Sequence, residues 1–81
     1  MDSKYVVQCK RLDGDIHYLR DPDMLDDFSE PPRVALTENV SMAYQYKNDR
    51  LGHMNGLFDC EKLVEWHRDR DDWVDCKLVT V

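Results

Sequence analysis

Three cysteines and three histidines are the side chains best suited to metal binding or nucleophilic chemistry. They are Cys9, His17, His53, Cys60, His67 and Cys76. Zinc sites usually contain two ligands roughly two to four residues apart, and no two of these six have that spacing. We therefore expect the cysteines to pack as small apolar residues, with no metal and no cofactor. Zinc held by Cys60, His67 and Cys76 is the weaker alternative.

No pattern in the chain predicts catalysis. Cys60 and His67 would lie about 10 Å apart along a helix axis, and the expected hairpin register places Cys9 and His17 on opposite faces. Motifs such as G-x-S-x-G, the P-loop and G-x-G-x-x-G are absent. The paired carboxylates lie in hydrophilic, turn-like contexts, where acids keep ordinary pKa values. We expect no catalytic residue and no enzyme activity.

Negative charge is concentrated in one quarter of the chain. The 81 residues carry a net charge of −6, and seven acids with one base, Arg20, lie between Leu12 and Pro31. The acids are Asp13, Asp15, Asp21, Asp23, Asp26, Asp27 and Glu30. Like charge repels nucleic acids and anionic membrane surfaces. The predicted partner is therefore a protein with a basic surface, and neither nucleic acid nor a membrane is expected to bind directly.

The spacing of these acids suggests how such a partner would be bound. Alternate residues of an extended strand lie roughly 6.8 Å apart on one side, and phosphates along one DNA strand rise about 3.4 Å each. Asp13 with Asp15 and Asp21 with Asp23 are thus expected to approximate a row of phosphates. A merely solubilising acidic face is the alternative.

Aromatic residues are the second binding signal, because interfaces favour Trp, Tyr, Met and Arg. Tyr46, Trp66 and Trp73 fall outside the expected core stripes and are predicted apolar anchors for the partner. Burial in the core is the alternative for the two tryptophans.

The first 20 residues predict a β-hairpin. Residues 5–12 and 15–20 flank Asp13-Gly14, which suits a two-residue turn. That turn pairs Cys9 with Tyr18 and Lys10 with His17. The expected core face is Tyr5, Val7, Cys9, Ile16 and Tyr18, and the mixed face is Val6, Gln8, Lys10, His17 and Leu19.

The remaining elements are expected in this order. Three prolines make residues 21–32 an irregular connection, and residues 33–36 form a short strand. Helices span 38–47, capped by Thr37, and 60–70, capped by Asp59. A loop with two glycines covers 48–56, and an alternating strand closes the chain over 73–81. The fold class is α+β: a single domain over 1–81, with a small antiparallel sheet and two short helices packed on one face.

No apolar run approaches 18 residues, so no transmembrane helix is expected. The first residues do not form a signal peptide, and three widely spaced cysteines argue against a disulfide scaffold. A cytoplasmic location follows as the expectation.

Short length, acidity, few motifs and a hairpin followed by short helices make the chain resemble small phage- or prophage-encoded accessory proteins, including anti-CRISPR and other anti-defence proteins. The resemblance lies in composition and layout, and it assigns no functional residue. It implies an inhibitor that occupies a basic nucleic-acid-binding surface of a host defence nuclease complex. The alternative is a structural or assembly module that forms a homodimer or joins a larger particle. That module would pair through Val6, Gln8 and Leu19 or through an exposed strand edge.

Overall fold

Strand β1 (Lys4–Arg11) organises the sheet in this computed structural model, which describes residues 4–26, 35–69 and 74–81. One edge of β1 pairs with β2 (Ile16–Leu19) and, nearer its start, with β4 (Tyr46–Lys47). The other edge pairs along its length with β5 (Val74–Thr80). Strand β3 (Leu36–Thr37) pairs with β2, and every pairing is antiparallel.

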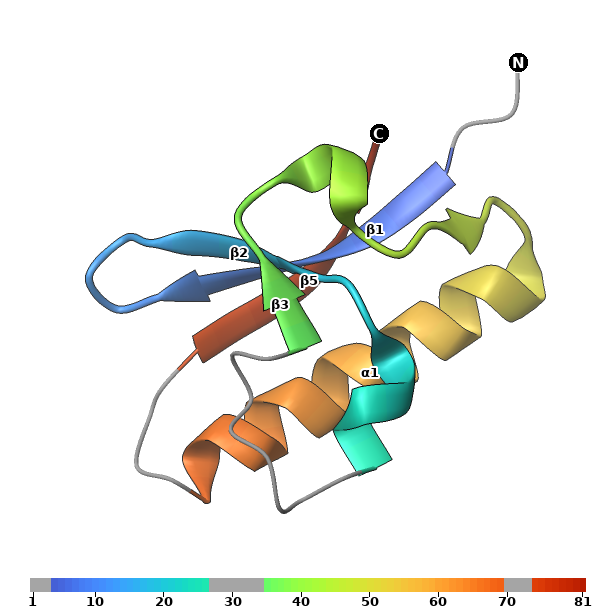
Figure 1. Ribbon diagram of the computed structural model, residues 1–81. Helices are drawn as coiled ribbons and strands as arrows, with labels where there is room; N and C mark the ends of the chain where they lie inside the picture. The colour runs from blue at the N-terminus through green and yellow to red at the C-terminus, as the bar shows by residue number, and fades with distance from the viewer. Residues whose placement is uncertain (1–3, 27–34, 70–73) are drawn as a thin grey trace.

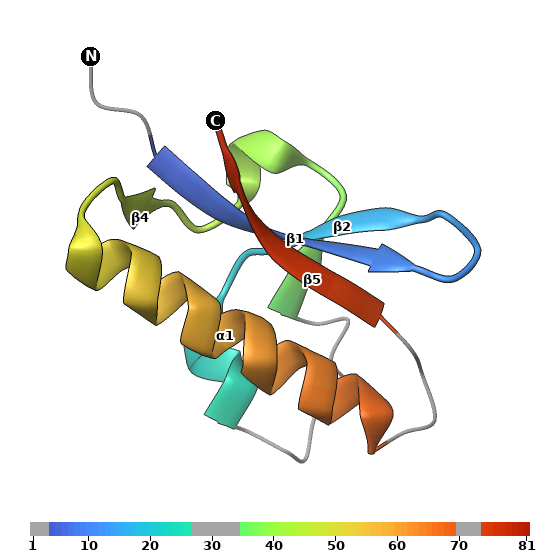
Figure 2. The same ribbon diagram turned by 180° about the vertical axis from the view of Figure 1, so that it is seen from behind.

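A long helix, α1 (Arg50–Arg68), covers one face of this sheet (Figures 1 and 2). Two 3-10 helices, η1 (Pro22–Asp26) and η3 (Val40–Met42), complete the described elements. Figure 2 shows η1 beside α1, whereas η3 lies on the opposite side of β1. The α+β class and the small antiparallel sheet are confirmed. The expected pair of helices on one face is wrong, because the described residues contain one α-helix.

The hairpin forms with a different register. Gly14 N donates to Arg11 O at 3.0 Å, and Arg11 N donates to Asp15 O at 2.9 Å. The loop therefore has three residues, and Gly14 adopts φ 97°, as expected for a tight turn that ends in a left-handed residue. Cys9 pairs with His17 rather than with Tyr18.

This one-residue shift exchanges the faces of β2, because side chains alternate along a strand. Leu19 is fully buried on the α1 side, together with Val7 and Cys9. Ile16 and Tyr18, expected in the core, point to the other face. Val6 is also fully buried, so two of the three residues predicted for self-pairing, Val6 and Leu19, are not open to a partner.

Helix α1 begins ten residues before the position that the sequence predicted. Asp49 caps it, and its side chain accepts a 2.7 Å hydrogen bond from Gly52 N. Asp59, the predicted cap, lies inside the helix. The buried face follows a helical period: Gly52, Gly56, Cys60, Leu63, Trp66 and His67.

The two helical glycines allow α1 to approach the sheet closely. A Cβ on Gly52 would lie 2.1 Å from the backbone oxygen of Lys47, and one on Gly56 would lie 2.5 Å from a Leu78 methyl group. These residues looked like loop signals because glycine weakens helices. Packing against β4 and β5 explains their presence inside α1.

The helix predicted over 38–47 is also wrong. Thr37 Oγ1 accepts from Asn39 N at 3.2 Å, and Asn39 Oδ1 accepts from Ser41 N at 3.0 Å. Such local side-chain bonds compete with helical hydrogen bonds, and the segment becomes β3, η3 and β4. The closing strand is confirmed as β5, and Trp73 lies outside the described residues.

The contacts around the two helical glycines predict that substitution by alanine destabilises the fold more at Gly52 than at Gly56. We expect G52A to lower the free energy of unfolding by about 1–3 kcal/mol, because backbone atoms at Lys47 would have to move. G56A should cost less than about 1 kcal/mol, since a Leu78 methyl can rotate away and alanine favours the helix. Urea unfolding of both variants measures the difference. A G52A protein as stable as the parent chain would contradict the close approach of α1 to β4.

Candidate functional site

The structure divides the acidic segment between two places. Asp13 and Asp15 are exposed in the hairpin loop, where Asp13 Oδ1 accepts from Asp15 N at 3.0 Å. Asp21 and Asp23 lie at the start of η1, beside α1. Neither pair lies in an extended strand, so the phosphate-like spacing expected from strand geometry does not form in either. Asp26 ends η1, whereas Asp27 and Glu30 lie outside the described residues.

Two of the predicted aromatic anchors belong to the core instead. Trp66 is 1% exposed and lies on the buried face of α1. Tyr46 is 5% exposed, because it lies in β4 and pairs with Tyr5 of β1. The expectation that these rings form an exposed anchoring surface is therefore wrong. Trp73, the third anchor, lies outside the described residues.

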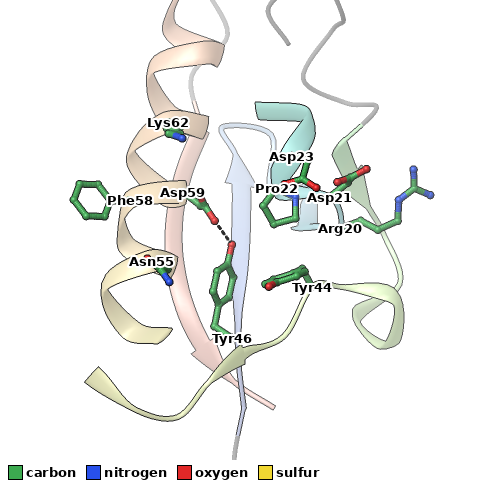
Figure 3. Close-up of a pocket in the computed structure, with 10 residues that line it drawn as sticks. All are labelled: Arg20, Asp21, Pro22, Asp23, Tyr44, Tyr46, Asn55, Phe58, Asp59 and Lys62. Carbon is green, nitrogen blue, oxygen red and sulfur yellow. Dashed lines mark hydrogen bonds between the residues drawn. The ribbon is translucent and has the colours of Figure 1, made fainter. Parts of the chain in front are cut away.

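Asp21, Asp23 and Tyr46 nevertheless come together at one surface pocket, which we call the η1–α1 pocket (Figure 3). It has a volume of about 540 Å³ and lies between the start of η1, the approach to β4 and one flank of α1. Its lining residues are Arg20, Asp21, Pro22, Asp23, Tyr44, Tyr46, Asn55, Phe58, Asp59 and Lys62.

A hydrogen bond between Tyr46 and Asp59 forms one wall of the pocket. The Tyr46 hydroxyl donates to Asp59 Oδ2, which joins β4 to α1 (Figure 3). Burial, and secondly this hydrogen bond to a carboxylate, raise the pKa of the Tyr46 phenol. Tyr46 therefore stays protonated at neutral pH and acts as a structural donor.

The opposite side of the pocket presents carboxylates beside an aromatic ring. Tyr44 is 48% exposed and packs edge-on against Tyr46, with ring centroids 4.9 Å apart. In Figure 3 the Tyr44 ring lies next to Pro22, on the same side as Asp21 and Asp23, whereas the Arg20 side chain extends away from the centre. Carboxylates and a phenol face are groups that bind cations. Among the described residues that line this pocket there is no Cys, Ser or His nucleophile.

The other predicted chemical groups do not join this pocket. Cys9 and His17 share a face after all, but Cys9 contacts Cys76, and His17 Nε2 lies 3.6 Å from Glu38 Oε1. His67 is buried and donates from Nδ1 to Leu63 O at 2.7 Å. Within the described ranges, no three His, Cys, Asp or Glu side chains form a group that could hold a metal.

Sequence reasoning missed seven of the ten lining residues: Arg20, Pro22, Tyr44, Asn55, Phe58, Asp59 and Lys62. Four of them lie on α1, whose first half was predicted to be a loop. The alternation of Tyr44 and Tyr46 was the available signal, because residues two apart share a face only in an extended chain.

The chain has no counterpart in three comparisons: no family, no curated protein and no solved structure matches it. In the described ranges, no helix is long and apolar enough to cross a membrane. The site must therefore be interpreted from its own chemistry.

The Tyr46–Asp59 hydrogen bond should be measurable in the stability of the fold. Y46F should lower the free energy of unfolding by about 1.5–3 kcal/mol at neutral pH, the usual range for a hydrogen bond to a charged group. Y44F, at an exposed ring, is the matched control and should change stability by less than about 0.5 kcal/mol.

The Tyr46–Asp59 pair also predicts how the stabilities of the parent chain and Y46F respond to alkaline pH. Because the pKa of Tyr46 is raised in the folded state, the unfolded chain loses this proton first, from about pH 10. Above that pH, the free energy of unfolding of the parent chain falls by up to about 1.4 kcal/mol per pH unit because of this group. Y46F lacks the phenol and does not show this fall. The stability gap should therefore narrow as pH rises, and a constant gap would argue against a buried, protonated Tyr46.

Proposed function

We propose that this protein is a non-enzymatic binding protein whose η1–α1 pocket receives a cationic side chain from a basic protein partner. The observation that carries this proposal is the grouping of Asp21 and Asp23 beside the exposed ring of Tyr44. An arginine or lysine placed there would bond to the carboxylates and lie against the aromatic face.

Each contact has a known physical basis. Hydrogen bonds between a guanidinium or ammonium group and a carboxylate are shorter and stronger than neutral ones. A cation over a tyrosine ring adds about 0.5–1 kcal/mol at an exposed site. Asp59 is already bonded to the Tyr46 hydroxyl, so Asp21 and Asp23 are the carboxylates that we expect to bind the partner's cation.

The net charge of −6 supplies a second, long-range contribution. A protein of this sign attracts a basic surface before contact, which speeds association and makes it sensitive to salt. Asp13 and Asp15, at the far end of the hairpin, would add to this attraction without touching the cation in the pocket.

Nucleic-acid-processing complexes are the partner class that fits best, because they expose clusters of arginine and lysine. We propose that the protein acts in the cytoplasm as a phage-type inhibitor and occupies the basic nucleic-acid-binding surface of a host defence nuclease complex. The support for this finer proposal is the charge pattern together with the resemblance to small anti-defence proteins in composition and layout.

A peptide of six arginines provides a direct test of the pocket. We expect the double variant D21N/D23N to bind this peptide at least about 10-fold more weakly than the parent chain, a difference of about 1.4 kcal/mol. The matched control is D13N/D15N, which removes the same charge from the hairpin loop and should weaken binding by less than about threefold. Calorimetric titration at low salt measures all three.

An equal loss in both double variants would show that net charge, rather than the η1–α1 pocket, attracts the peptide. For the natural partner, the parent chain and D21N/D23N can be used as baits in lysate with low-salt and high-salt washes. A basic nuclease complex retained only by the parent chain, and released by salt, would support the inhibitor proposal.

A second candidate function, an assembly module, is favoured by an apolar stripe on α1. Leu51, Met54, Leu57 and Phe58 are 66%, 46%, 46% and 58% exposed along the helix surface. We propose a second copy of the chain as the occupant. Two α1 helices packed antiparallel about Leu57 would place Arg50 near Glu65 of the partner subunit, an attractive charge pair.

Light scattering over a range of concentrations tests this assembly. L57E should remain a monomer where the parent chain dimerises, because a buried carboxylate would oppose apolar packing. The control is L12E, at a hairpin residue that is 87% exposed and distant from the stripe. A parent chain that stays monomeric throughout would remove this candidate.

A further inference from the structure

Two cysteines face each other across the longest strand pairing of the sheet. Cys9 of β1 is directly opposite Cys76 of β5. Val81 N donates to Lys4 O at 2.9 Å, so Lys4 and Val81 form a hydrogen-bonded pair of the same ladder. Hydrogen-bonded and non-hydrogen-bonded pairs alternate along an antiparallel ladder, and Cys9 is an odd number of positions away from Lys4. Cys9 and Cys76 therefore form a non-hydrogen-bonded pair, the kind with the closer Cα atoms, about 4.5 Å apart.

That geometry suits a covalent link between the strands. Disulfides join residues whose Cα atoms are roughly 4.4–6.8 Å apart and whose Cβ atoms point the same way. Directly opposite residues of a sheet meet both conditions. The two sulfur atoms are already in contact, 2.6 Å apart, and both thiols are free.

The thiols of Cys9 and Cys76 differ in their access to solvent. Cys9 is fully buried, whereas Cys76 is half-buried in an edge strand whose outer side pairs with no other described strand. Cys76 and Cys60 also line a surface cavity of about 530 Å³ on α1. The rest of its lining is Leu57, Glu61, Val64, Glu65 and Arg68. A small oxidant in this cavity would meet Cys76 or Cys60 before it reached Cys9.

The environment of the thiols indicates which one reacts first. The hydrogen bond with Cys76, and then burial, raise the pKa of the Cys9 thiol. Burial raises the pKa of Cys60 to about 12. Cys9 is closed off from solvent, and burial disfavours the nucleophilic thiolate form of Cys60. Cys76, which is more exposed and lines the cavity, is therefore the first reactant.

We propose that Cys9 and Cys76 form a site of reversible oxidation, at which a two-electron oxidant such as hydrogen peroxide links β1 to β5 through a disulfide. The Cys76 thiolate attacks one peroxide oxygen, the O–O bond breaks, and the departing hydroxide takes up the thiol proton as water. Cys76 is then a sulfenic acid. Cys9 Sγ attacks the sulfur of Cys76, the S–O bond breaks, and the hydroxide leaves with the Cys9 proton as a second water.

The electrons balance, since two thiols lose two electrons and peroxide gains two. A dithiol reductant reverses the reaction by thiol–disulfide exchange. The link would fasten the edge strand β5 to the centre of the sheet, and Cys60 would remain a free thiol.

Peptide mapping after oxidation tests this assignment. The folded, reduced full chain is treated with hydrogen peroxide, alkylated, and digested with trypsin without reduction. We expect peptide 5–10, which contains Cys9, joined to peptide 71–77, which contains Cys76, and alkylated Cys60 in peptide 51–62. Treatment with dithiothreitol should restore three alkylatable thiols.

Two variants separate this pair from the third thiol. C60S should form the same link at an unchanged rate, whereas C76S should form no link and keep two alkylatable thiols. Circular dichroism of the reduced variants confirms that each is folded. A link that includes Cys60, a disulfide between two chains, or oxidation of Cys76 to a sulfinic acid without a link would overturn the proposal.

Discussion

The close approach of α1 to the edge of the sheet is the constraint on which the other features depend. At Gly52 the helix passes so near the backbone of Lys47 that a methyl group has no room, and at Gly56 it meets the side chain of Leu78. Interiors pack as densely as organic crystals, so a larger residue at Gly52, where the neighbour is backbone, would displace the helix. That displacement would separate Asp59 from Tyr46.

Helix α1 divides the surface into two sites of different chemistry. Asn55, Asp59 and Lys62 lie on the flank that faces η1 and line the pocket proposed for a cation. Cys60 and Val64 lie on the other flank and line the cavity next to Cys76. Because one rigid helix supplies both sets of side chains at helical spacing, neither site needs a long loop for its construction.

The two proposed activities use different physical properties of the chain. Binding of a basic partner depends on exposed charge at η1, and it is sensitive to salt because solvent screens such charges. Oxidation of Cys9 and Cys76 depends on strand register and on access through β5. Binding of the partner can change without a change in the oxidation of the cysteines, since Asp21 and Cys76 line different cavities.

The sequence by itself determined the features that depend on local patterns. Alternating apolar residues predicted the hairpin strands and β5, and the count of acids determined where the charge lies.

Sequence reasoning misplaced the features that depend on contacts between distant residues. Gly52 and Gly56 resembled loop signals because their packing partners, Lys47 and Leu78, lie in other elements. Only the tertiary structure decided that α1 begins at Arg50, that Tyr46 meets Asp59, and that Cys9 faces Cys76. The physical reason is that burial and steric fit between segments outweigh local propensities of at most about 1 kcal/mol per residue for amino acids other than proline.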